Sequence, residues 1–126
     1  PRDWSSDVCS SDLTAAKIPW LYYVDPVEGT DHFGKRQPVD FIVNVTEQLE
    51  TKIAALSCHA SQREWLRRQH GMDEYTEACR RWGAARGKES GFGCGEGFRQ
   101  YKGHPHPTSN ALAELLQGRI HLTSRD

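Results

Sequence analysis

The sequence predicts a mixed α/β fold, and three observations favour it. Short runs rich in aromatic and β-branched residues alternate with longer segments in which apolar residues recur every three or four positions. The expected order along the chain is strand, strand, long helix, helix, strand and short helix. The length of 126 residues is enough for one domain of ordinary size and too short for two.

The composition excludes several classes of function. The chain has 16 Lys and Arg against 17 Asp and Glu, which gives a net charge of −1. We therefore expect no binding to nucleic acid or to membrane surfaces through a basic field. The apolar runs Ile18–Val24 and Phe41–Val45 are too short to span a bilayer. The four cysteines form no CxxC pair and follow no secretory leader, so we expect reduced thiols and a cytoplasmic location.

The first thirteen residues differ in character from the rest. Ser-Ser-Asp occurs twice between Trp4 and Leu13, without any amphipathic period. The run Asp3–Leu13 resembles one translated reading frame of a sequencing adapter. We expect residues 1–13 to be an artefactual or disordered leader and residues 14–126 to carry the fold.

The remaining segments are assigned from their periodicity and their turn residues. Strands are expected at 18–24, 39–45 and 96–102, and helices at 46–69 and 73–86. A last short helix is expected after Ser109. The glycine-rich run 87–95 fits no phosphate-loop pattern in any register, so we expect it to be a flexible loop.

Polar residues near the end of the long helix form the most informative cluster. His59 and Gln62 are three residues apart and share a helix face. They fit a pocket at the ends of the strands, but a polar helix end packed against the sheet is the favoured interpretation, because ordinary polar helix faces outnumber sites. A small independent zinc protein is another alternative, with ligands drawn from Cys58, His59, Cys94 and His104. Their spacing does not enforce convergence, so we expect no metal ligands in this chain.

Several motifs together resemble the C-terminal half of the PIG-L/LmbE-like deacetylases. The family pattern K-x-x-A-x-x-x-H-x-S-Q is matched by Lys52, Ala55, His59, Ser61 and Gln62. Asn44 stands where the family more often has Asp, and Gly97 stands where Ala is commoner. The segments 63–66, 70–75 and 95–100 are similar to one bacterial branch, and the resemblance covers nearly all of residues 17–118.

The resemblance implies a fold and an activity. The family forms a Rossmann-like α/β sandwich and removes acetyl groups from N-acetylglucosamine-type amides with a bound metal, usually zinc. Neither of the family's metal-binding motifs occurs in this sequence. We therefore expect an incomplete C-terminal portion of such a sandwich, with helices 46–69 and 73–86 covering a two- or three-stranded remnant sheet. The parent would be a zinc enzyme, and this chain would bind no cofactor, contain no catalytic residue and be inactive alone.

The resemblance also implies candidate binding residues. We expect His59, Gln62, Glu96 and Arg99 to lie at the rim of the substrate site, with packing as the competing interpretation for each. The expected partner is a small N-acetylated sugar bound by the parent enzyme, and a homo-oligomer is left open. The alternative from another class is a self-contained, non-catalytic α+β module that binds a partner.

Overall fold

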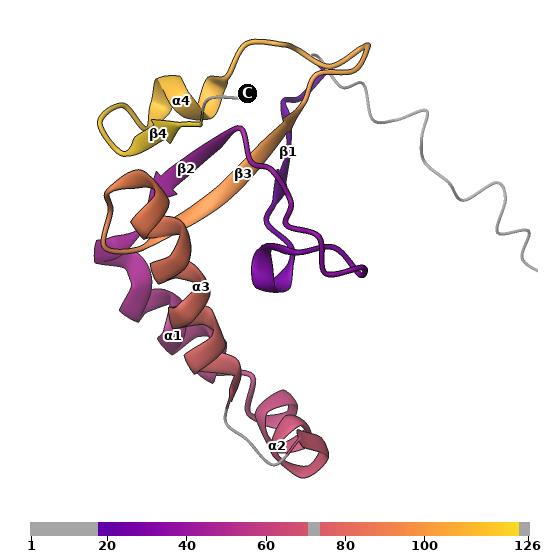
Figure 1. Ribbon diagram of the computed structural model, residues 1–126, viewed down its shortest axis with the longest axis vertical. Helices are drawn as coiled ribbons and strands as arrows, with labels where there is room; N and C mark the ends of the chain where they lie inside the picture. The colour runs from indigo at the N-terminus through magenta and orange to yellow at the C-terminus, as the bar shows by residue number, and fades with distance from the viewer. Residues whose placement is uncertain (1–17, 71–73, 124–126) are drawn as a thin grey trace, which may run out of the picture.

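The computed structural model describes residues 18–70 and 74–123 (Figure 1). The expected leader at 1–13 and the expected helix start at residue 73 lie outside these ranges. The described part is a mixed α/β fold in which a four-stranded sheet is combined with several helices. The predicted fold class is confirmed at this level.

The sheet contains more strands than the sequence indicates. Its spatial order is β1-β3-β2-β4, and every pair is antiparallel. The strand bounds are Leu21–Val24 for β1, Phe41–Asn44 for β2, Gly95–Tyr101 for β3 and Ile120–Leu122 for β4. The expectation of two or three strands is wrong, because β4 pairs with β2 as a fourth. Three residues are too few to show the alternation that identifies a strand in a sequence.

The core lies where β2 and β3 pair. Phe41 and Ile42 are fully buried, and they lie opposite Phe98 and Gly97. Successive residues of a strand point to opposite faces, so Phe41 and Ile42 bury the two sides of the sheet. The ring of Phe41 stacks on Phe98 at 5.5 Å and meets the edge of Tyr22 at 6.0 Å. The centre of the sheet is thus buried on both faces.

The long helix expected at 46–69 is divided. A 3-10 turn at Thr46–Gln48 (η2) leads into α1 at Leu49–Ser57, and α2 follows at Ala60–His70. The Ser57 hydroxyl donates to the carbonyl of Ile53 at 2.8 Å, and the Cys58 thiol donates to that of Ala54. Such bonds to the preceding turn bend and end helices. Figure 1 shows α2 at the end of the molecule away from the sheet. The expectation that this part of helix 46–69 covers the sheet is therefore wrong.

The second long helix packs directly on the sheet. This helix, α3, spans Glu74–Ser90 and lies against β3, with α1 beside it (Figure 1). It continues past residue 86, where the sequence predicts a loop. The Ser90 hydroxyl bonds to the carbonyls of Arg86 and Gly87 and secures the last turn. No helix in the described ranges is both long and apolar enough to cross a membrane.

The glycines of the predicted loop bring α3 close to β3. A Cβ on Gly87 would lie 2.9 Å from the Cα of Cys94, and one on Gly83 would meet the Cys94 sulfur. A Cβ on Gly95 would lie 2.6 Å from Ile42. The expectation of a flexible loop over 87–95 is therefore wrong at both ends, which belong to α3 and β3.

Two further short elements complete the described fold. These are a 3-10 turn after β1 (η1, Val27–Gly29) and α4 (Ala111–Leu115). Asn110, one residue after the expected cap Ser109, is the N-cap of α4, and its side chain accepts from the amide of Ala113. The Gln100 side chain donates to the carbonyls of Pro107 and Ser109 and holds this segment to β3.

Candidate functional site

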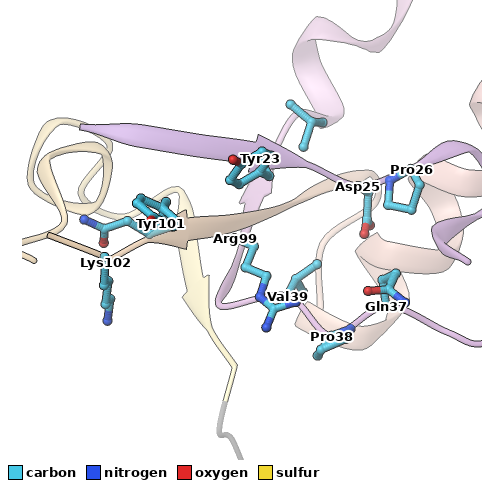
Figure 2. Close-up of a pocket in the computed structure, with 12 residues that line it drawn as sticks. Tyr23, Asp25, Pro26, Gln37, Pro38, Val39, Arg99, Tyr101 and Lys102 are labelled. Atoms are coloured by element: carbon cyan, nitrogen blue, oxygen red, sulfur yellow. The ribbon is translucent and has the colours of Figure 1, made fainter. Parts of the chain in front are cut away.

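A cavity of about 570 Å³ lies at the end of the sheet that α3 leaves uncovered (Figure 2). It is lined by residues of β1, of β3 and of the loops that follow β1 and precede β2: Tyr23, Val24, Asp25, Pro26, Gln37, Pro38, Val39, Arg99, Gln100, Tyr101, Lys102 and Gly103. Cavities of this volume are typical of sites for small molecules. The cavity is therefore the candidate functional site of the described chain.

The strand register determines which side chains share the face on which the cavity lies. Tyr23 is directly opposite Arg99, so the two lie on the same face of the sheet. Tyr101 is two residues from Arg99 in β3 and shares that face as well. Toward the start of β3, the same face carries Gly97 and Gly95. A Cβ on Gly95 would meet the backbone of α3. Thus α3 and the cavity occupy two ends of one sheet face.

Arg99 is one of three charged residues that line the cavity, with Asp25 and Lys102. Its side chain is exposed, and Figure 2 shows it extending from β3 toward the side where Pro38 and Val39 lie. Within residues 18–70 and 74–123, no hydrogen bond or ion pair engages this guanidinium. Its donors are available to a ligand in the cavity.

The acidic residue of the cavity wall is already neutralised. Asp25 receives two bonds from Arg86, of 2.5 Å from Nε and 2.9 Å from Nη2. Arg86 also donates to Glu89 at 2.8 Å and to the carbonyl of Gln37 at 3.0 Å. The two side chains are 8% and 15% exposed, so the pair is nearly buried. The carboxylate of Asp25 is therefore committed to the fold.

Gly97 provides the space that this ion pair needs. A Cβ at position 97 would lie 2.6 Å from Oδ2 of Asp25 and 2.7 Å from Cγ1 of Val39. The amide of Asp25 also donates to the carbonyl of Gly97 at 3.0 Å. The glycine that departs from the family pattern thus lies directly under the carboxylate.

The four residues expected at the substrate rim do not converge. Arg99 lines the cavity, but Glu96 does not: it lines a smaller cavity between α1, α3 and β3, where it forms an ion pair with Lys52 of α1. His59 is exposed between α1 and α2, and Gln62 is exposed on α2. The substrate role of these residues stays a prediction, and the structure brings only Arg99 to the cavity.

The sequence reasoning missed the aromatic side chains beside Arg99. The segment that contains Tyr23 is predicted correctly as a strand, but its pairing partner is not visible in the sequence. Tyr101 lies two residues from Arg99 on β3, whereas Tyr23, 78 positions before Tyr101, is placed beside Arg99 by the β1–β3 register. The β-branched and aromatic composition of both strands was the available signal.

A second, smaller cavity of about 90 Å³ lies between α1, α3 and β3 and is lined in part by Lys52, Cys79, Cys94 and Glu96. Burial alone would lower the pKa of the Lys52 ammonium, but the hydrogen bond and the charge of Glu96 outweigh it and raise that pKa. Burial, together with the charges of Cys79 and Glu96, raises the pKa of the Cys94 thiol. Both groups are thereby held in their protonated forms.

The described residues do not fit a metal ion. Over these ranges, no three His, Cys, Asp or Glu side chains are grouped closely enough to hold one. The ligand set Cys58, His59, Cys94 and His104 is not assembled, since Cys94 is buried beside Gly83 and Cys58 is exposed directly after α1.

The fold and the site were compared with known proteins. The chain matches no protein-family model, and no curated protein and no solved structure is significantly similar to it.

Proposed function

We propose that this chain is the substrate-binding C-terminal part of a metal-dependent N-deacetylase of the PIG-L/LmbE-like kind, acting on N-acetylglucosamine-type amides. The sequence motifs around Lys52, His59 and Gln62 support the family. The antiparallel sheet is compatible with the margin of a Rossmann-like sandwich, because largely parallel sheets often carry antiparallel strands at their edge.

The cavity at Arg99 is the observation that carries the proposal. Sugars are bound by flat apolar or aromatic surfaces combined with a few fixed polar groups. The cavity provides Tyr23 and Tyr101 as aromatic surfaces and Arg99 as a donor. In this proposal the part of the chain in the reaction is to bind and orient the sugar through these cavity residues.

The test is a titration of the full 126-residue chain with N-acetylglucosamine, followed through its backbone amide NMR signals. We expect saturable shifts at Tyr23, Asp25, Arg99 and Tyr101, and loss of these shifts in Tyr23→Ala and Tyr101→Ala. Arg68→Ala, on α2 outside the cavity, should bind as the parent chain does. Shifts that do not saturate, or that persist in both tyrosine variants, would contradict the proposal.

A non-catalytic binding module is the second candidate. The observation that favours it is the position of α2 away from the sheet, with Trp65 53% exposed. The gene sequence upstream of this chain distinguishes the two candidate functions. A copy of the gene without the adapter-like segment should encode a His-Pro-Asp-type segment upstream of Thr14 if the deacetylase proposal is right. The absence of such a segment would favour the binding module.

A further inference from the structure

The β1 edge of the sheet is open and lacks the features that usually protect such an edge. β1 is the first strand in the order β1-β3-β2-β4, so among the described strands it pairs with β3 alone. Residues 20–24 contain no charge, and the two nearest prolines, Pro19 and Pro26, stand outside them. The opposite edge, β4, is three residues long and directly follows Arg119. Short strands and charged residues are common protections, and an edge without them is a template for another strand.

The register shows which main-chain groups of this edge point outward. The amide of Asp25 donates to the carbonyl of Gly97, so this pair and every second pair before it exchange hydrogen bonds between β1 and β3. Trp20, Tyr22 and Val24 occupy the alternate positions, whose N–H and C=O groups point away from β3. Within the described ranges, no other segment forms main-chain hydrogen bonds with these groups. The edge therefore offers a row of donors and acceptors to a further strand.

Apolar side chains flank this row on both faces of the sheet. Trp20 and Val24 are 42% and 61% exposed and share one face, while Tyr23 lies on the other face and is 56% exposed. Together with Ile18 they expose roughly 400 Å² per copy, on the scale of about 150–250 Å² for a whole aromatic side chain. Two copies joined here would bury about 1,000 Å² once the main chain is included, which is the size of a weak, reversible complex.

We propose that two copies of this chain associate through their β1 edges, antiparallel about a two-fold axis, and join their four-stranded sheets into one. The edge is complementary to itself in this arrangement. With Tyr22 opposite its counterpart, Trp20 of each copy lies opposite Val24 of the other, and Leu21 lies opposite Tyr23. Aromatic and β-branched residues form favourable cross-strand pairs, and no charge is buried among them. The short β4 edges then lie at the two ends, so the assembly closes at two copies.

The proposed interface borders the cavity and goes beyond the proposed function. Tyr23 and Val24 belong both to the β1 edge and to the cavity lining. In the paired arrangement, Leu21 of the second copy lies beside Tyr23. The cavity wall that β1 forms is then extended by the second copy and is complete only in the dimer.

The first experiment measures the association of the full 126-residue chain by sedimentation equilibrium. We expect a monomer–dimer equilibrium with a Kd of roughly 10–100 μM, because interfaces of this size are weak. Amide hydrogen exchange is then followed by NMR at low and at high concentration. Exchange at Tyr22 and Val24 should slow severalfold as the dimer forms, whereas the amide of Asp25, which is bonded to Gly97, should be protected at both concentrations.

Substitutions at Trp20, which does not line the cavity, test the side-chain contacts. Trp20→Lys places a charge on the outward edge and should weaken dimerisation about tenfold or more. Trp20→Phe loses the same hydrogen bond to Ser109 but keeps an aromatic ring, so it should dimerise nearly as the parent chain does. Leu122→Lys is the matched control on the β4 edge, where Leu122 is 66% exposed, and it should leave the Kd unchanged.

The outcomes separate this interface from other arrangements. A chain that stays monomeric while Tyr22 and Val24 exchange freely would overturn the proposal. A monomer in which both amides are protected would also overturn it, because the edge would then be covered within the same chain. A dimer with unchanged exchange at these amides, or one weakened equally by Leu122→Lys, would place the interface elsewhere. Slower exchange at both amides and a loss confined to Trp20→Lys support the proposal, and none of these results depends on sugar binding.

Discussion

Gly97 connects the core of the sheet to the wall of the cavity. It lies opposite the buried Ile42, and the carboxylate of Asp25 occupies the place where a larger side chain would begin. The resemblance to the deacetylases marks this glycine only as a departure from the commoner alanine. The structure gives the reason, because an alanine would displace Asp25 from its bonds with Arg86.

Substitution of Gly97 tests this account. Gly97→Ala should destabilise the chain by about 3–5 kcal/mol, because it displaces the carboxylate of Asp25 from its nearly buried pair with Arg86. The control is Gly34→Ala, whose φ of 75° brings backbone strain but whose surroundings are open. The control should cost only about 1 kcal/mol. The measurement is the urea midpoint of each variant, and equal midpoints for the two would contradict the explanation.

At the scale of elements, charged pairs connect α3 to its neighbours in two different environments. Arg86 joins α3 to Asp25, which follows β1, in a nearly buried pair. Arg80 joins α3 to Glu50 of α1 in a pair that is largely exposed, and this contact lowers the pKa of Glu50. Both arginines contact their carboxylate through two nitrogens, so burial is the main difference between the pairs.

This difference predicts unequal effects of the same substitution. Arg86→Met should cost about 3–5 kcal/mol, since it leaves Asp25 as a buried, unpaired charge. Arg80→Met should change the urea midpoint little, because solvent screens exposed pairs. The double variant Asp25→Ala/Arg86→Met should recover part of the loss. Similar midpoints for Arg86→Met and Arg80→Met would show that burial does not determine the strength of these pairs.

The elements also show how much of the fold the sequence predicts. The strands near 18–24, 39–45 and 96–102 are found correctly, because their composition and alternation are local properties. The break after Ser57 and the strand β4 are missed, since the first depends on side-chain bonds to carbonyls and the second on pairing with β2. The cavity is missed as well, because it depends on the pairing of β1 with β3. Arg99 is anticipated from the resemblance, whereas Tyr23 joins it only through the strand register.

At the scale of the whole molecule, the described core is small. The buried apolar residues are Val39, Phe41, Ile42, Val43 and Cys94. Other large apolar side chains are well exposed, among them Val24 at 61% and Leu122 at 66%. A core of this size leaves the stability of the chain sensitive to each buried polar contact.

Alkaline pH should therefore destabilise the chain. Lys52 and Cys94 both have raised pKa values in the folded state. Their contribution to stability is complete below the ordinary thiol value of 9.0 and is lost as the pH rises through the folded values. We expect the urea midpoint to be constant from about pH 7 to 8 and to fall above about pH 9.

The variant Lys52→Met/Cys94→Ala serves as the control for the pH dependence. It should begin with a lower midpoint and lose less of it between neutral and alkaline pH. An equally steep decline in this variant would assign the effect to other groups, such as the tyrosines.

The double contact of Arg86 has a consequence for selectivity. One guanidinium holds the Asp25 side chain after β1 and the Gln37 carbonyl before β2, and both residues line the cavity at Arg99. Arg86 itself is not part of that lining. The two loops that contribute Asp25 and Gln37 to the cavity are thus held together by a side chain of α3 that is not part of the lining. We expect a shorter residue at position 86 to release both loops, so the shape of the cavity depends on a residue outside its lining.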